Sequence, residues 1–227
     1  LFDPIPKRKN PKPRLVYKIE NNDRPLYAKL IDKEISNNSI QLVKRIPWVS
    51  VNSLEDMLRE MLLRDFYNSV MRGLITEYVE AGEPYLLSAG AWISNLVRNY
   101  DSFNMVLTSL PGKEKEALQQ MLDKIEYVHR FGFTDEVLQP LIEKYRQGVR
   151  ANMGQEGSMP NSVFLQIYQD NFLLGRPLCT VDEKLDVTLS VLDTLSAKNF
   201  QDWISDWYGG SDNWVFLMQG NDSTYLF

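Results

Sequence analysis

The chain has 227 residues, of which 44% are hydrophobic and 11% aromatic, and its formal net charge at pH 7 is −5. This length suits one large domain or two small ones, and the apolar content is ample for a buried core. The negative charge gives no reason to expect nucleic acid as a partner, and no apolar run approaches the roughly 20 residues of a membrane span.

The sequence contains a single histidine, His129, and a single cysteine, Cys179. Zinc and similar metals are normally held by three or four ligands, mostly His and Cys, so these two residues cannot supply a standard site. A nucleophilic triad is excluded unless it is built around His129, and an internal disulfide is excluded altogether. We therefore expect no catalytic residue, no metal ligand and no cofactor in this chain.

The first 24 residues read as a linker. The chain begins at Leu1 without an initiator methionine, and residues 4–14 are proline-rich and basic. Such a stretch resists helix and sheet and favours extended polyproline geometry. We interpret residues 1–24 as an interdomain linker, with a recruitment site for an acidic partner as the alternative. A linker at this place predicts that the chain is a piece of a longer protein with a preceding domain.

Two short strands are expected next. Apolar side chains alternate with others from Leu26 to Leu30 and again over residues 40–42, and the turn-rich residues 36–39 lie between them. This pattern predicts a hairpin-like pair of strands that ends near Pro47.

A long helix follows. Ser53 is a candidate N-cap with Asp56 at the third helical position, and apolar residues then recur at intervals of three and four as far as Ile75. We expect the helix to end at Gly82-Glu83-Pro84. Strands are expected over residues 85–97 and 102–110, separated by Arg98-Asn99.

After Pro111-Gly112 the apolar period becomes helical for most of the remaining chain. Thr134 is a candidate cap for the second of these helices, and Thr180-Val181-Asp182-Glu183 is a capping box. The helices expected are over 118–128, over 138–149, from Pro160 with Val163, Phe164, Ile167 and Tyr168 facing inward, over 185–192, and over 200–207. Residues 214–218 read as a final buried strand.

Runs of strands and runs of helices, rather than strict alternation, predict an α+β fold with helices packed on a mostly antiparallel sheet. We expect one domain over residues 25–220, followed by a tail over 221–227.

No group stands out as a catalyst. His129 lies at the end of a predicted helix, where the helix dipole favours a histidine that bonds the last carbonyls. Cys179 lies at a helix start without a partner base and is interpreted as a small packed residue. Carboxylates with helical spacing, such as Glu114 with Asp123 or Asp202 with Asp206, occur too widely to assign an acid or a base.

Two further features have structural interpretations. The glycines of residues 154–157 lack the strand-before, helix-after context of a phosphate loop, and we interpret them as a mobile connection between helices. Phe200, Trp203, Trp207, Trp214 and Phe216 are interpreted as a helix and a strand that pack on each other. An exposed interface onto a missing domain is the alternative.

Several segments, taken in order along the chain, carry a resemblance to a known family. The segments are residues 2–6 at a domain junction, 65–71 in the long helix, 83–90 before the next strand, 131–138 with 143–146 at a helix start, the 200–207 helix and the 214–218 strand. In this order they resemble the insulinase-like (pitrilysin) zinc metallopeptidases, and the resemblance covers nearly the whole chain. No single motif is specific to that family, but the order of the segments is.

The resemblance implies an α/β domain that recurs twice in each half of a clamshell-shaped peptidase. Only one domain of that family carries the zinc motif His-x-x-Glu-His, and this chain has no such motif. The resemblance therefore implies the metal-free second domain of a half, following the catalytic domain, with zinc in that other domain. Its partners would be the catalytic domain of the same chain and a peptide substrate, and an envelope location in bacteria is implied by analogy.

Two functions follow from the resemblance. In the first, the domain packs on the zinc domain and forms part of a chamber for the peptide. A peptide must be held in place there, so that its scissile bond keeps the geometry that attack requires. Alternatively, it belongs to a catalytically inactive member that serves as a structural or interaction subunit. A free-standing binding module is a third interpretation, against which the linker argues. In each case we expect the chain alone to be inactive as a peptidase.

Overall fold

The computed structural model describes residues 9, 10, 12, 15, 17–48, 51–82 and 85–221, with Glu156 described by its backbone alone. Half of the expected linker and nearly all of the expected tail therefore lie outside the described residues, as do Glu83 and Pro84 at the expected end of the long helix.

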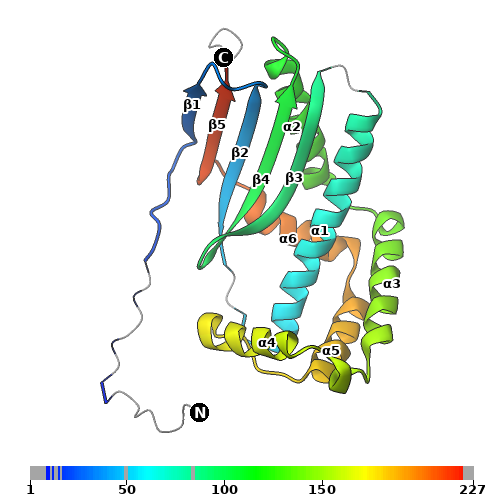
Figure 1. Ribbon diagram of the computed structural model, residues 1–227. Helices are drawn as coiled ribbons and strands as arrows, with labels where there is room; N and C mark the ends of the chain where they lie inside the picture. Colours follow the sequence, from blue (N-terminus) through cyan, green and yellow to red (C-terminus); the bar gives the residue numbers. More distant parts are fainter. Residues whose placement is uncertain are drawn as a thin grey trace.

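The elements follow the predicted α+β order (Figure 1). The first half contains β1 (Leu26–Ile31), β2 (Ser39–Pro47), α1 (Leu54–Glu80), β3 (Leu86–Val97) and β4 (Tyr100–Ser109). The second half contains α2 (Glu114–Phe131), α3 (Asp135–Asn152), a 3-10 turn (Glu156–Ser158), α4 (Asn161–Leu174), α5 (Val181–Thr194), α6 (Ala197–Tyr208) and β5 (Trp214–Gly220).

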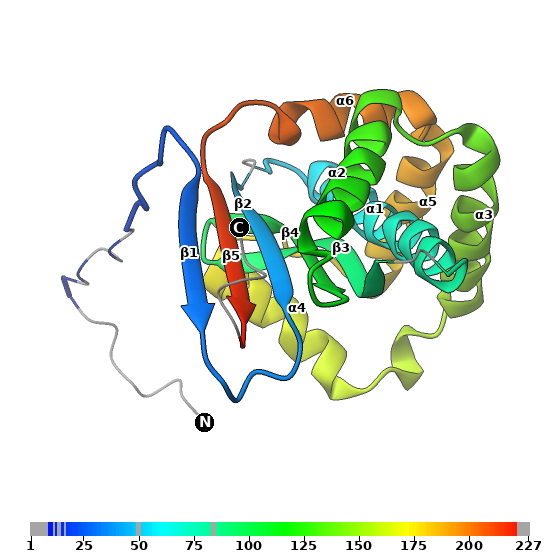
Figure 2. The ribbon, with the colours of Figure 1, turned by 90° about the horizontal axis from the view of Figure 1, so that it is seen from above.

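The five strands form one sheet in the order β1-β5-β2-β4-β3. The pair β1–β5 is parallel, and the other three pairs are antiparallel. The expectation of a mostly antiparallel sheet is confirmed. The helices gather on one face of the sheet, where α1 packs on β3 and α2 packs on β4 (Figures 1 and 2). This arrangement places the core between that face and the helices.

The predicted hairpin of the first two strands is wrong, because β5 lies between β1 and β2 and pairs with both. The physical reason is the apolar run of β5. Phe216 and Met218 point to the core side, opposite Leu42 and Ile40, whereas all six residues of β1 are exposed. An interior place suits the apolar strand, and the edge suits the strand that buries little.

The inward face predicted for α4 is partly wrong. Val163, Phe164 and Ile167 are half-buried, but Tyr168 is 62% exposed, and no residue of α4 is fully buried. The helix lies at the end of the molecule away from the sheet, beside the start of α5 (Figure 1). A helix in that place contacts its neighbours along one edge only.

The predicted caps provide a matched pair for a stability test. The Thr180 hydroxyl accepts the backbone N–H of Glu183 at 3.1 Å, whereas Thr134, also at an N-cap, makes no side-chain cap bond. Thr180→Ala should lower the free energy of unfolding by about 1 kcal/mol, and Thr134→Ala by clearly less. Urea unfolding of the two variants measures the difference. Equal losses would show that the cap bond at Thr180 contributes nothing.

Candidate functional surface

His129 lies in the core rather than at a charged helix end. Its ring is 4% exposed, its Nε2 is 2.8 Å from the Tyr67 hydroxyl, and the rings of Phe103, Trp207 and Tyr208 surround it. Burial lowers the pKa of His129 from 6.5 to about 3, against a smaller opposing effect of Glu126. The ring is therefore neutral at pH 7, and the interpretation of a histidine stabilised by the helix dipole is wrong. Desolvation of the charge outweighs the dipole here.

The residues around His129 do not fit a zinc ion. A zinc ligand needs a free ring nitrogen and two or three further His, Cys, Asp or Glu groups nearby. Nε2 faces the Tyr67 hydroxyl, and Nδ1 has no hydrogen-bond partner among the described residues, but the rings packed around the imidazole are aromatic and offer no further ligands. Within the described part of the chain, no group of three His, Cys, Asp or Glu residues could hold a metal. We derive no chemical step through zinc for this domain.

Cys179 is half-buried just before α5, beside Leu178 and Phe164. Burial raises the pKa of its thiol, and this effect exceeds the opposing one of Lys184. Reactive cysteines are those with lowered pKa values. The interpretation of Cys179 as a packed, unreactive residue is supported.

The helix-spaced carboxylates serve structural or solvated roles. Glu114 is buried and accepts hydrogen bonds from the Asn38 side-chain amide at 2.6 Å and from the Gly112 N–H at 3.2 Å. Asp123 bonds Gln119, and Asp202 forms an ion pair with Lys198 on the surface of α6. Glu60 is the more unusual acid, since burial raises its pKa while the Trp203 indole N–H donates to it at 2.9 Å. In these contacts the helix-spaced carboxylates have separate partners.

The aromatic cluster joins α6 and β5 as predicted, and Phe103 of β4 lies between them as well. Phe103 on β4 lies between Trp207 of α6, at a ring separation of 5.5 Å, and Trp214 of β5, at 6.1 Å. Phe216 instead stacks on Tyr27 at 5.1 Å, towards the edge of the sheet. Helix α6 and strand β5 also contact each other directly, since the ring of Tyr208 lies 5.9 Å from that of Trp214.

The sheet leaves its second face uncovered by helices (Figures 1 and 2). Side chains along a strand point alternately to the two faces of the sheet. Ile40 and Leu42 of β2 face the core, so the residues that follow them, Gln41 and Val43, face the open side. The pairing register places apolar residues from every strand there. They are Leu26, Leu30, Val43, Trp92, Val106, Val215 and Leu217. Leu30 is 57% exposed, Trp92 38% and Leu217 37%.

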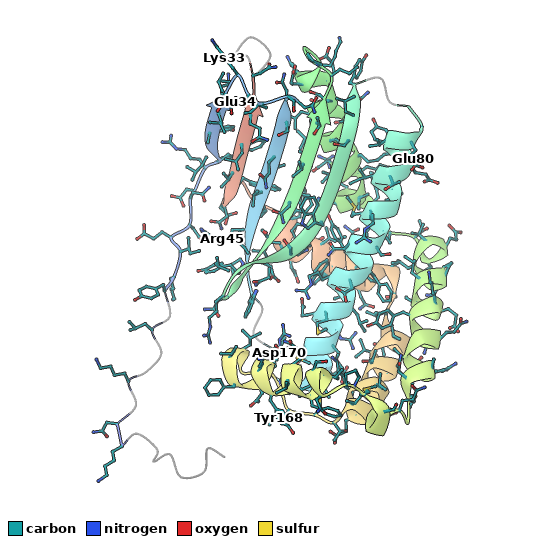
Figure 3. The ribbon with its side chains drawn as sticks, viewed as in Figure 1. Lys33, Glu34, Arg45, Glu80, Tyr168 and Asp170 are labelled. Atoms are coloured by element: carbon teal, nitrogen blue, oxygen red, sulfur yellow. The ribbon has the colours of Figure 1, made fainter. Side chains whose placement is uncertain are left out.

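One end of the open face is polar and well ordered by hydrogen bonds. The Arg45 guanidinium donates to the Glu20 carbonyl and to Asn213 Oδ1, each at 2.7 Å, and lies 5.4 Å from the centre of the Tyr100 ring (Figure 3). The Ile19 N–H donates to the Tyr100 hydroxyl at 3.2 Å. Residues 19–22, which the sequence assigned to the linker, are held against this end of the sheet.

A groove with a volume of about 1030 Å³ lies between α1, α3, α4 and α5. Most of its exposed lining surface is apolar, and Asp65 and Lys144 are among its charged residues. Burial raises the pKa of Asp65, and this effect exceeds the opposing one of Arg64, which lies 4.0 Å away. Leu165, Tyr168 and Phe172 occupy the exposed side of α4, and Phe172 is 85% exposed.

Neither the open face nor this groove was predicted from the sequence, although the sequence contains a signal for each. The continuous apolar run of β5 predicts contacts on both faces of the sheet, not on one. Helix α4 carries apolar residues around its whole circumference, which is typical of a helix covered on more than one side.

In the described residues, no helix is both long and apolar enough to cross a membrane.

No protein-family model and no curated protein matches the chain. Solved structures do. The first half of the periplasmic protease PqqL from Escherichia coli matches with a TM-score of 0.78 at 13% identity, over 96% of this chain and 46% of that one. A predicted insulinase-family protease from Yersinia pestis matches with a TM-score of 0.68 at 10% identity, over 95% and 46%. A peptidase M16 inactive domain from Pseudomonas fluorescens matches with a TM-score of 0.64 at 9% identity, over 94% and 48%.

Nearly the whole chain thus aligns with less than half of each of these structures. Identities of this size carry information on the fold alone. The chain therefore has the fold of a domain of the insulinase-family (M16) proteases, as the resemblance of its sequence implies.

Proposed function

We propose that this chain is a non-catalytic domain of an insulinase-family zinc peptidase, which packs on the zinc-binding domain and forms part of the wall of the peptide chamber. The observation that carries the proposal is the open, partly apolar face of the sheet on a domain with this fold. An apolar sheet face normally lies against another layer of structure. Zinc would be held by the other domain, and this chain would hold the peptide in place. A location in the bacterial envelope belongs to the same proposal, by analogy with the periplasmic PqqL.

A second candidate function has its own support. One of the matching structures is described as an inactive M16 domain. The chain would then belong to a protein without peptidase activity, in which the same open face holds a structural partner. The two candidates make the same prediction for this chain alone and differ only in the rest of the protein.

The coding region upstream of Leu1 separates the candidates. An in-frame domain with His-x-x-Glu-His supports the zinc peptidase, and an upstream domain without it supports the inactive protein. A start codon at Leu1 would remove the basis of both. With purified chain alone, we expect no zinc retained after dialysis and no zinc-dependent peptide hydrolysis, and detectable hydrolysis would contradict the proposal.

The role of the open face is tested in the longer peptidase. Val43→Lys places a charge on the face while leaving the core-facing Leu42 and Lys44 in place. We expect kcat/KM for a peptide substrate to fall at least about tenfold, since a buried unpaired charge disrupts packing or substrate contact. Leu165→Lys on the exposed side of α4 is the matched control, with kcat/KM expected to stay within about twofold. Equal activity of the two variants would exclude the face from the chamber and from the domain contact.

A further inference from the structure

Residues 19–22 form a strap that is bonded to the sheet along its whole length. The Ile19 N–H donates to the Tyr100 hydroxyl at 3.2 Å. The Glu20 carbonyl accepts from the Arg45 guanidinium at 2.7 Å, and so does the side-chain oxygen of the next residue at 3.1 Å. The segment before β1 passes beside the turn between β3 and β4 (Figure 1). Side chains from β4 and β2 thus hold the first part of the strap.

The end of the strap is fixed by Asn213, which precedes β5. The Asn213 N–H donates to the Asn22 carbonyl at 2.9 Å, and the Asn22 N–H donates to Asn213 Oδ1 at 3.3 Å. The same oxygen accepts from the Arg45 guanidinium at 2.7 Å. Asn213 is 4% exposed and has a φ of 62°, a left-handed conformation that few residues other than glycine and asparagine adopt. A buried residue in this conformation, bonded to the strap by its backbone and its side chain, indicates that the local structure is arranged around the contact.

The strap is held from the open side of the sheet. Arg45 follows Val43 by two positions in β2, so its side chain points to the open face as well. Tyr100 precedes Ser102, the partner of Arg45 in β4, by two positions and points the same way. The guanidinium of Arg45 lies 5.4 Å from the centre of the Tyr100 ring. Because these two side chains hold the strap, the chain reaches β1 from the open side and not from the side of the helices.

We propose that the strap directs the preceding part of the protein onto the open face, with Arg45 and Asn213 as the positioning residues. This role rests on the proposed function, in which the open face contacts the zinc-binding domain. Without the strap bonds, residues 19–24 could reach about 20 Å in any direction from the start of β1. The bonds remove that freedom, and a shorter free connection raises the effective concentration of an attached domain at the open face.

Nitrogen-15 relaxation of the purified chain tests whether the strap is fixed. We expect order parameters of about 0.85 for the amides of residues 19–22, as in rigid backbone, and values below about 0.6 after Arg45→Met. Arg146→Met is the matched control, because Arg146 of α3 pairs with Glu143 and Asp193 instead, and it should leave the strap amides unchanged. Circular dichroism checks that both variants are folded. Flexible strap amides in the unmodified chain, or rigid ones after Arg45→Met, would overturn the proposal.

A milder variant separates release of the strap from a general loss of stability. Tyr100→Phe removes only the hydroxyl that accepts the Ile19 N–H. It should lower the order parameter of Ile19 and leave that of Asn22 unchanged, because Asn213 still holds Asn22. A uniform decrease along the strap and the strands would contradict a local attachment.

Thiol labelling in the longer protein tests the direction that the strap imposes. Leu217→Cys places a thiol on the open face, and Cys179→Ser removes the natural one. We expect this thiol to react at least about tenfold more slowly in the longer protein than in the chain alone, because a second layer covers the face. Adding Arg45→Met should raise the rate in the longer protein at least about threefold, and adding Arg146→Met should not change it.

The outcomes distinguish a failure of the strap from a failure of the proposed function. Equal labelling of the longer protein and of the chain alone would show that nothing covers the open face, and both proposals would be wrong. A thiol that stays protected after Arg45→Met would overturn the role of the strap and leave the proposed function standing. A thiol that Arg146→Met exposes as much as Arg45→Met does would overturn the role of the strap equally, because its exposure would not depend on the strap bonds.

Discussion

The free energy of unfolding is expected to fall by about 2 kcal/mol between pH 7.5 and pH 5 because of His129 alone. The pKa of His129 is about 3 in the folded chain, against an ordinary value of 6.5. Below pH 6.5 the unfolded chain therefore takes up a proton that the folded chain does not. The contribution of neutral, buried His129 to the free energy of unfolding is therefore fully present above that pH. It is lost progressively as the pH falls towards 3, at about 1.4 kcal/mol per pH unit.

Urea unfolding at a series of pH values measures this loss, and a double variant identifies its source. Tyr67→Phe with His129→Phe replaces the hydrogen-bonded pair by apolar rings of similar shape, a change that is often nearly neutral. We expect this variant to lack the 2 kcal/mol loss above pH 5. The window lies above the ordinary pKa of Glu126, whose own pKa is lowered, so that carboxylate contributes little within it. An equal loss in both proteins would show that the titrating group is not His129.

Phe103→Ala should lower the free energy of unfolding by about 3–5 kcal/mol, which is a large part of the stability of a typical domain. Phe103 is 0% exposed and its ring contacts those of Trp207, Trp214 and His129. Its removal leaves a cavity where α6, β5 and the end of α2 meet. If this variant does not fold, Phe103→Leu should fold with a smaller loss of about 1–2 kcal/mol.

The control replaces an exposed phenylalanine, instead of a buried one, by alanine. Phe172 on α4 is 85% exposed, and Phe172→Ala should change the free energy of unfolding by no more than about 0.5 kcal/mol. Urea unfolding monitored by circular dichroism compares the two variants. Similar losses in the free energy of unfolding for Phe103→Ala and Phe172→Ala would contradict the packing of the aromatic cluster described above.

Local patterns in the sequence determined most elements and their ends. The long helix begins after Ser53, whose hydroxyl accepts the Asp56 N–H at 3.0 Å, and the capping box at Thr180 and Glu183 forms as predicted. Strands β3 and β4 lie where expected and turn through Asn99, whose φ is 69°. These features depend on residues three or four positions apart, so composition and spacing are enough to predict them.

The charge state of His129 could not be predicted from its neighbours in the sequence. Its place in the last turn of α2 suggests a charged residue that the helix dipole stabilises. Its pKa is set instead by Tyr67, Trp207 and Tyr208, which come from α1 and α6 and remove the ring from water. Burial depends on which faces meet in three dimensions, and spacing along one helix does not report it.

The sequence by itself determined the α+β class, the lack of histidines and cysteines for a standard zinc site, and the resemblance to insulinase-family domains. Only the tertiary structure decided the order of the strands, and with it the surface on which the proposals depend. Insertion of β5 between β1 and β2 makes β1 an exposed edge and leaves apolar residues on the open face. Strand pairing over such distances is selected by the total apolar area buried in the whole fold, which no local pattern contains.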